Sequence, residues 1–385
     1  MNEYLPGLEG VPATRSNISC IDGEKGILSY RGYPIEQLAK SSSFEETAML
    51  LLDGRLPTSE ELASFDAQLR ANRRVKYNIR EMMKHLPSAG HPMEMLQTAV
   101  ASLGMFYPGN ECLTSPEACA DLDYVHNMTV KIIARIPVIV TMWNHIRSGY
   151  DPIEPRSDLS YAENFLYMFH GTEPDPLHAE ILDTCLILHA EHTINASTFA
   201  ALVAGSTLAS PYGVIAAAIG TLSGPLHGGA NQRVVAMLET IGGPNNVEEV
   251  LDQKLANKEK IWGFGHREYK VKDPRSNIMQ GMMERLAKQK GGDISPLFET
   301  ARALEEAAEE RLGLKGVYPN VDFYSGILYS ELGIPVDQFT PIFAVARSAG
   351  WLAHWREQLS DNRIFRPTQV YTGEPLRDYV PIDKR

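Results

Sequence analysis

Signals for the start and end of helices recur along nearly the whole chain. The four-residue segments that begin at Ser43, Thr58 and Ser160 follow the capping-box pattern, in which a hydroxyl residue precedes a glutamate by three positions. Ser115-Pro116-Glu117 places a proline at the first position of a further predicted helix, which continues through "VKIIARIP". Gly54 follows the apolar run "FEETAMLLLD", which begins directly after Ser43, and glycine is a typical helix-ending residue. The sequence therefore predicts a mainly α fold.

Strand signals are scarce and lie near the start of the chain. In "NISCIDGEKGILSYRGY", short apolar runs flank Asp22-Gly23, which predicts a small N-terminal β-hairpin. The chain has no internal repeat and no long low-complexity linker. Its 385 residues exceed the size at which one hydrophobic core stops growing, about 250–300 residues, so two domains are predicted.

Charge and hydropathy exclude several classes of protein. A formal net charge of −12 argues against a general nucleic-acid binder, which needs a basic surface. The longest uncharged stretch, 193–232, contains Asn195 and a Ser210-Pro211-Tyr212-Gly213 break, which favours two buried helices over a membrane span. We therefore expect a protein that binds neither nucleic acid nor membrane.

The cysteines and the N-terminus indicate the compartment. The cysteines form no CxxC pair and no dense framework, so they are expected to be reduced thiols. They are Cys20, Cys112, Cys119 and Cys185. The first ten residues, "MNEYLPGLEG", are acidic and lack the apolar core of a signal peptide. A cytoplasmic location is predicted.

One segment carries an excess of positive charge. Residues 254–275 include seven lysines and arginines against three acidic residues. In an acidic chain, such a patch indicates a small anionic ligand. A solvated, lysine-rich surface loop would explain the lysines equally well.

Two histidines lie three residues apart in "LHAEHTINAS". On a predicted helix, His189 and His192 would share a face. A metal pair is conceivable, but an HEXXH motif is absent and no cysteine ligand lies nearby, so no metal site is predicted. The alternative is a hydrogen-bonded histidine at a helix end.

His227 lies in "SGPLHGGANQ", directly before a predicted helix. The positive end of the helix dipole would disfavour an imidazolium and keep the ring neutral. A neutral ring can donate a hydrogen bond to a developing oxyanion. The alternative is a turn residue without a chemical role.

His266 lies in "WGFGHREYKVKDPRSN", where two glycines free the backbone and an Asp273-Pro274-Arg275 turn follows. A histidine beside guanidinium groups can act as a general acid toward a carboxylate substrate. The alternative is a surface-loop histidine. The "GFG" is no nucleotide fingerprint, because GxGxxG and GxxxxGK[ST] are both missing.

Asp322 lies between apolar neighbours in "YPNVDFYSG". Partial burial would raise the pKa of its carboxyl group and make it a stronger base. The alternative is a helix N-cap aspartate. No GxSxG motif is present, which argues against a serine hydrolase of that type.

Taken together, "PLHGGANQ", "GFGHREYKVKDPR" and "NVDFYSG", in this order and spacing, resemble the citrate synthase family. Segments near both ends, "SCIDGEKGILSYRGYPIEQLA" and "ARSAGWLAHWREQLSDNRIFRPTQVYTG", are similar to its terminal signatures. The resemblance covers nearly the whole chain. It implies a helical homodimer with a large domain from residues 1–225 and 336–385 and a small domain from residues 226–335. The active site would lie in the cleft between them, and the domains would close over the substrates.

The resemblance also implies the chemistry. His227, His266 and Asp322 match the catalytic triad of the family. Asp322 would remove a methyl proton from acetyl-CoA, and His227 would stabilise the resulting enol or enolate. His266 would polarise or protonate the carbonyl oxygen of oxaloacetate. Hydrolysis of citryl-CoA would then give citrate and CoA, the step by which acetyl groups enter the tricarboxylic acid cycle.

Ligand residues are implied in the same way. His192, Arg275 and Arg347 match the oxaloacetate ligands of one subunit, and Arg366 matches the arginine that reaches in from the neighbouring subunit. Acetyl-CoA is a co-substrate, and no permanently bound cofactor is expected. The CoA candidates are basic side chains and one loop residue. They are Lys254, Lys260, Phe264, Arg267 and Lys315.

Two alternatives remain for the function. One is a 2-methylcitrate synthase, which uses propionyl-CoA and shares these motifs. The other is a CoA-binding helical protein without turnover. The hairpin signature begins near Asn17, which leaves no room for the extra N-terminal domain that some bacterial members of the family carry, so a compact dimer without NADH control is expected.

Overall fold

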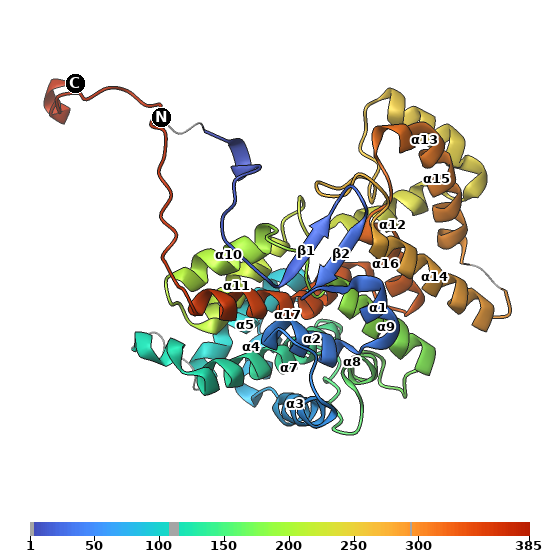
Figure 1. The fold of residues 1–385 in the computed structure, drawn as a ribbon, viewed down its shortest axis with the longest axis horizontal. Helices are drawn as coiled ribbons and strands as arrows, with labels where there is room; N and C mark the ends of the chain where they lie inside the picture. Colours follow the sequence, from blue (N-terminus) through green and yellow to red (C-terminus); the bar gives the residue numbers. More distant parts are fainter. Residues whose placement is uncertain (1–3, 108–114, 293–294) are drawn as a thin grey trace.

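The computed structural model describes residues 4–107, 115–292 and 295–385. Nearly all of the ordered elements are helices, which confirms the mainly α prediction (Figure 1). In chain order, the longer helices are α1 (Ile35–Ser41), α2 (Phe44–Asp53), α3 (Ser59–Asn72), α4 (Tyr77–Lys84), α5 (Pro92–Phe106), α7 (Leu122–Ile146), α8 (Tyr161–His170), α9 (Pro176–His189), α10 (Ala196–Ser206), α11 (Pro211–Leu222), α12 (Ala230–Ile241), α13 (Val247–Ala256), α14 (Pro274–Gln289), α15 (Pro296–Leu312), α16 (Val321–Glu331) and α17 (Phe339–Leu359).

The predicted helix starts are mostly confirmed by the caps. Thr58 and Ser160 each form a complete capping box, and the Ser43 hydroxyl accepts a hydrogen bond from the backbone N–H of Glu46. Gly54 ends α2 in the left-handed conformation, with φ of 80°.

The helix start predicted at 115–117 is confirmed only for a short 3-10 helix, Pro116–Ala120, which has proline at its first position but no side-chain cap from Ser115. The prediction that this helix continues without a break is wrong. The Asp121 carboxylate accepts hydrogen bonds from the backbone N–H groups of Asp123 and Tyr124, so α7 begins at Leu122. An aspartate that satisfies two backbone donors is the better N-cap.

The predicted hairpin is confirmed and gains a third strand. Strands β1 (Ser19–Asp22), β2 (Ile27–Tyr30) and β3 (Tyr33–Pro34) form an antiparallel sheet in the order β1-β2-β3. Asp22 pairs with Ile27 across the first turn, and Tyr30 pairs with Tyr33 across the second.

Two long helices form the centre of the largest helical group. Every residue of α17 from Phe339 to Trp355 is buried. By length and composition α7 could cross a membrane, but 83% of its most apolar window is buried inside the protein. This burial is typical of a core helix of a globular protein, and α17 packs directly on α7.

Helices α12 to α16 form a second group, which packs largely on itself. Helix α16 contacts both α12 and α14, and α13 packs on α15 (Figure 1). The group joins the rest of the chain mainly through α9, α1 and α17. The loop between α13 and α14, residues 257–273, carries His266.

The expectation of reduced cysteines holds for Cys20 and Cys185, which are free thiols, but fails for Cys119, which is disulfide-bonded. Cys112 lies outside the described residues.

Candidate active site

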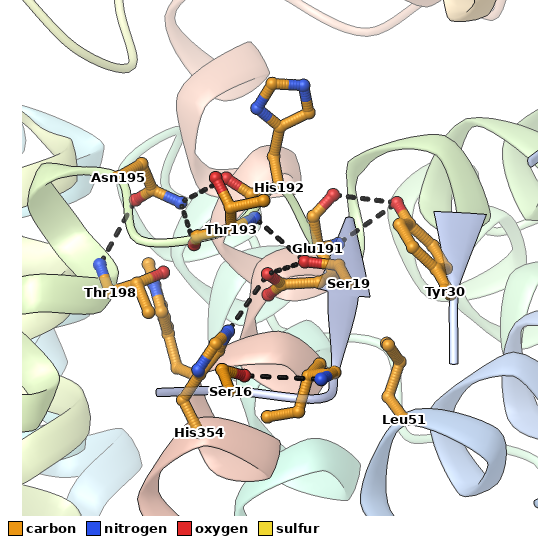
Figure 2. Close-up of polar contacts among 12 residues, drawn as sticks. Ser16, Ser19, Tyr30, Leu51, Glu191, His192, Thr193, Asn195, Thr198 and His354 are labelled. Carbon is orange, nitrogen blue, oxygen red and sulfur yellow. Dashed lines mark hydrogen bonds and ion pairs between the residues drawn. The ribbon is translucent and has the colours of Figure 1, made fainter. Parts of the chain in front are cut away.

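The end of α9 places His192. The helix ends at His189, and Thr193 adopts a left-handed φ of 52°, so the chain turns away directly after the helix. The prediction that His189 and His192 share a helix face is therefore wrong. His189 is buried and donates from Nδ1 to the carbonyl oxygen of Cys185 (2.8 Å), whereas the His192 ring points away from the residues packed below it (Figure 2).

Two buried guanidinium groups complete the end of α9. Arg347 donates from Nε to the carbonyl oxygen of His189 (2.7 Å), and Arg275 donates from Nη1 to that of Leu188 (3.4 Å). Both arginines are only 2% exposed. The C-terminus of a helix carries partial negative charge, which favours cations there. Two of the predicted oxaloacetate ligands thus lie in the interior beside His192.

Arg275 is further held by Asp273. Its Nε and Nη2 atoms donate to the two carboxylate oxygens of Asp273 at 3.0 and 2.7 Å. This bidentate pair fixes the plane of the guanidinium group. Asp273 is also the N-cap of α14, so the start of that helix and the position of Arg275 depend on one carboxylate.

His192, His266 and Tyr269 form an aromatic cluster. The Nε2 atom of His192 is 3.1 Å from the hydroxyl oxygen of Tyr269. The centroids of the His192 and His266 rings are 5.0 Å apart, and those of His266 and Tyr269 are 4.8 Å apart. The structure therefore brings together the two histidines that the sequence placed 74 positions apart.

The proton of His266 is assigned by its backbone neighbours. Its Nδ1 atom accepts a hydrogen bond from the backbone N–H of Glu268 at 3.0 Å. Since a backbone N–H can only donate, the neutral ring carries its proton on Nε2. Burial and the nearby Arg275 charge lower the pKa of His266 to about 4, so the ring is neutral at pH 7.

His227 carries its proton on the other nitrogen. Its Nε2 atom accepts from the backbone N–H of Ser197 (3.3 Å) and is 2.8 Å from the Ser197 hydroxyl, so the proton lies on Nδ1. The indole N–H of Trp351 donates to the same hydroxyl oxygen. The ring is neutral, as expected from the sequence, but for another reason: burial and the charge of Arg347 lower its pKa to about 4.

Asp322 is the second residue of α16, and Asn320 caps that helix by accepting from the Asp322 backbone N–H (3.0 Å). The alternative that Asp322 is itself the N-cap is therefore wrong. Burial raises the pKa of its carboxyl group to about 6, against the opposing charges of Arg275 and Arg347. Among the described residues, no hydrogen-bond partner reaches its buried Oδ1 atom.

These side chains share one electrostatic environment. The charge of Arg347 lowers the pKa of both His227 and Asp322. The charge of Arg275 acts in the same direction on His192, His266 and Asp322. The site therefore combines two neutral hydrogen-bond donors and one base of raised pKa with two fixed positive charges. The donors are His227 and His266, the base is Asp322, and the charges are those of Arg275 and Arg347.

The predicted CoA residues are more dispersed. The ammonium group of Lys260 lies 4.3 Å from the centroid of the Trp262 ring, and the Phe264 ring packs on Phe323. Lys254 forms an ion pair with Glu259 at 3.0 Å. Arg267 and Lys315 are exposed.

Sequence reasoning missed Arg233, Tyr269 and Ser197. The Arg233 guanidinium lies 4.3 Å from the centroid of the Trp262 ring, the same ring that Lys260 contacts. Tyr269 was close to His266 in the sequence, which was a usable signal. The bonds of Ser197 to His227 join residues 30 positions apart, and no local pattern indicates them.

A buried carboxylate supports the segment that carries His192. Glu191 is fully buried, and its Oε1 atom accepts from the Ser19 hydroxyl (2.9 Å) and lies 3.0 Å from Nε2 of His354 (Figure 2). The Ser19 oxygen accepts in turn from the backbone N–H of Thr193. Although burial opposes the charge, His354 and Arg347 hold the pKa of Glu191 below its usual value.

Arg366 lies apart from the other predicted residues. It is exposed in the extended segment after α17, and its Nη1 atom donates to the adjacent Pro367 carbonyl oxygen. It lines a cavity of about 930 Å³ between the two terminal segments and helices α10 and α17. Both termini extend from the body on the same side (Figure 1). Within one chain, Arg366 does not join the cluster around His192.

Metal ligation finds no support in the described part of the chain, where no group of three or more histidine, cysteine, aspartate or glutamate side chains is arranged to hold an ion.

Comparison with known proteins gives one family. The family model described as the citrate synthase C-terminal domain matches residues 7–368. A citrate synthase of Acidithiobacillus ferridurans is 64% identical over 99% of this chain and 98% of its own length. That of Synechocystis sp. is 54% identical over 99% of this chain and 94% of its own.

Solved structures agree. The crystal structure of citrate synthase from Pyrobaculum aerophilum has a TM-score of 0.92 and 41% identity, covering 98% of this chain and 95% of that one. The ternary complex of carboxymethyl coenzyme A and oxaloacetate with citrate synthase from Thermoplasma acidophilum has a TM-score of 0.91 and 34% identity, covering 100% of this chain and 100% of that one. The chain belongs to the citrate synthase family.

Proposed function

We propose that the chain condenses acetyl-CoA with oxaloacetate and hydrolyses citryl-CoA to citrate and CoA. One observation carries the proposal: Asp322, a base of raised pKa, shares a charged environment with two neutral histidines whose protons are assigned to defined nitrogens. Removing a proton beside a carbonyl needs a base and a donor for the developing oxyanion.

The roles follow from the proton positions. Asp322 removes a methyl proton from acetyl-CoA. His227 donates from Nδ1–H to the thioester oxygen and stabilises the enol or enolate. His266 donates from Nε2–H to the keto oxygen of oxaloacetate, which makes the keto carbon more electrophilic. The new carbon–carbon bond joins the former methyl carbon of the acetyl group to the keto carbon of oxaloacetate. Water then cleaves the thioester.

Oxaloacetate binding is assigned to His192, Arg275 and Arg347. A dianion is favoured where buried guanidinium groups already carry fixed positive charge. Both arginines are held by hydrogen bonds to the end of α9, so little side-chain ordering remains for the substrate to impose.

We assign the CoA part of the substrate to the face formed by Arg233, Lys260 and Trp262, with Phe264 and Arg267 nearby in the sequence and the exposed Lys315 as a further candidate. The two cations and the indole ring offer charge for phosphates and an aromatic surface for a base. Lys254 is the weakest candidate, because its ammonium group is already paired with Glu259.

We propose a homodimer in which Arg366 enters the neighbouring site, supported by the exposed apolar side chains of the C-terminal segment, Ile364, Val370, Tyr371, Leu376, Tyr379 and Ile382. We also propose that residues 226–335 move as a small domain against 1–225 and 336–385, so that closure excludes water from the reaction. We further propose that the reaction takes place in the cytoplasm, as a step of the tricarboxylic acid cycle.

The decisive experiment is thiol release from acetyl-CoA with and without oxaloacetate, compared with propionyl-CoA by kcat/KM. Oxaloacetate-dependent release with a preference for acetyl-CoA supports the proposal. A preference for propionyl-CoA would identify a 2-methylcitrate synthase. Both substrates must be measured, because one methylene changes the discrimination between them by only about 1–3 kcal/mol. Binding of CoA without any release would leave a protein without turnover.

A further inference from the structure

The turn between β1 and β2 lies against the loop that carries His266. The Gly23 carbonyl oxygen accepts a hydrogen bond from the backbone N–H of Lys270 at 3.0 Å. A Cβ atom at Gly23 would overlap the Glu268 carbonyl oxygen and lie 2.7 Å from the Glu268 carbonyl carbon. Only glycine permits this approach. Figure 1 shows the hairpin extending toward the α12–α16 group.

The backbone that Gly23 contacts is the backbone that orients His266. The N–H of Glu268 donates to Nδ1 of His266 at 3.0 Å, and that of Tyr269 lies at 3.5 Å from the same atom. The Tyr269 hydroxyl is 3.1 Å from Nε2 of His192. A shift of this backbone would therefore change the direction of the His266 Nε2–H and the contact of His192 together.

The other end of the hairpin is anchored beside His192. Ser19, at the start of β1, bonds the Glu191 carboxylate and the Thr193 backbone N–H, and the Tyr30 hydroxyl is 2.8 Å from the Glu191 carbonyl oxygen (Figure 2). The hairpin thus joins segment 191–193 at its base to segment 268–270 at its tip. It connects two backbone segments that belong to different helical groups.

A second glycine of the turn has a similar contact. Gly26 has a φ of 65°, and a Cβ atom there would lie 2.7 Å from Cγ2 of Val271. Gly23 and Gly26 therefore both bring the turn close to residues 268–272.

We propose that Gly23 and Gly26 are positioning residues, whose close contact with segment 268–272 holds His266 with its Nε2–H directed at the keto oxygen of oxaloacetate. This inference rests on the proposed role of His266 and adds the part of the fold that sets its geometry. Neither glycine touches the substrate, and both act through the loop backbone.

The test is Gly23→Ala, with two readouts. Gly23 does not have a positive φ, so alanine introduces the contact without backbone strain. We expect kcat/KM for oxaloacetate to fall roughly 10- to 100-fold, the scale of a small misplacement of a catalytic group, with KM for acetyl-CoA changed little. We also expect the carbonyl ¹³C resonance of bound [2-¹³C]oxaloacetate to move back toward that of the free ligand, because the hydrogen bond that polarises the carbonyl is weakened.

A matched control is Gly32→Ala, at the β2–β3 turn of the same sheet. Gly32 has a φ of 87°, and a Cβ atom added there would have no other atom within 4 Å, so alanine strains the sheet without touching the loop. This variant should keep the wild-type ¹³C resonance and oxaloacetate kinetics. If Gly23→Ala matches wild type, or if Gly32→Ala matches Gly23→Ala, the positioning role is wrong.

A rescue experiment keeps the proposal testable if Gly23→Ala does not fold. Gly26→Ala should lower kcat/KM for oxaloacetate, and adding Val271→Ala should restore part of it by removing the methyl group in the way, while the strain of alanine at a φ of 65° is the same in both variants. A double variant as impaired as Gly26→Ala alone would contradict the contact. Failure of the proposed function is distinguishable, because wild-type protein itself would then show no oxaloacetate-dependent thiol release.

Discussion

At the scale of single residues, Asp322 is placed where burial opposes the charge that its role requires. Burial raises the pKa of its carboxyl group to about 6. Replacing it with asparagine should lower kcat at least roughly 10²-fold, the low end for loss of a general base. Steady-state kinetics with saturating substrates would measure this, and near-normal turnover would remove Asp322 from the mechanism.

Asp322→Asn should lower kcat but raise the free energy of unfolding at neutral and alkaline pH. Because the folded pKa is raised above the unfolded value, the stabilising contribution of the carboxyl group is complete below about pH 4 and is lost as the pH rises through about 6. Asp322→Asn should therefore stabilise the fold by roughly 1–3 kcal/mol at pH 8 and by little at pH 4. Denaturant unfolding at the two pH values checks this, and equal effects at both would contradict it.

The pH dependence of the reaction follows from the same group. The value of kcat/KM for acetyl-CoA should fall as the pH drops through about 6, because Asp322 becomes protonated. His227 and His266, with pKa values lowered to about 4, stay neutral across this range and add no second limb there. A profile that is flat from pH 8 to pH 5 would show that Asp322 is not the base.

At the scale of the elements, helix ends are decided locally. Thr58 and Glu61 form a complete capping box at the start of α3. Thr58→Ala should destabilise the protein by about 0.5–2 kcal/mol, the usual cost of a lost N-cap. Ser64→Ala, an exposed change within the same helix, should stay within about 0.5 kcal/mol of wild type. Denaturant unfolding compares the two, and equal effects would deny Thr58 a capping role.

The end of α9 shows where local prediction stops. The apolar spacing of "PLHAEILDTCLILHAEH" correctly indicated a helix, but it extended that helix through His192. The carbonyl oxygens of Leu188, His189 and Ile187 at the true end accept hydrogen bonds from Arg275, Arg347 and Tyr30, respectively. These partners come from distant parts of the chain, so no pattern near residue 189 could place the boundary.

At the scale of the whole molecule, the role of Arg366 depends on a second chain. Arg366→Ala should raise KM for oxaloacetate by roughly 10-fold or more, the effect of losing a charge-assisted contact of about 1.5–3 kcal/mol. Arg363→Ala, from the same cavity wall, should leave that KM near wild type.

Mixing an Arg366→Ala chain with an inactive Asp322→Asn chain makes the test of sharing direct, provided that activity is measured at an oxaloacetate concentration well below the raised KM, where Arg366→Ala alone has little turnover. A mixed dimer of Arg366→Ala and Asp322→Asn chains contains one intact site if Arg366 acts across the interface, and none if it acts within its own chain. Random mixing should then restore about a quarter of wild-type activity, because half of the dimers are mixed and each has one intact site. No recovery after confirmed subunit exchange would place Arg366 outside the neighbouring site.

The sequence by itself determined the mainly α class, most helix starts and the hairpin, because caps, turns and periodicity act over a few residues. The segments around His227, His266 and Asp322 were indicated by their resemblance to the citrate synthase family. Tertiary structure decided the rest. The proton positions of His227 and His266, the departure of His192 from the helix and the contact of Gly23 with the His266 loop depend on partners far away in the chain. Burial, which sets the pKa of Asp322, is likewise a property of the packed molecule and not of its neighbours in sequence.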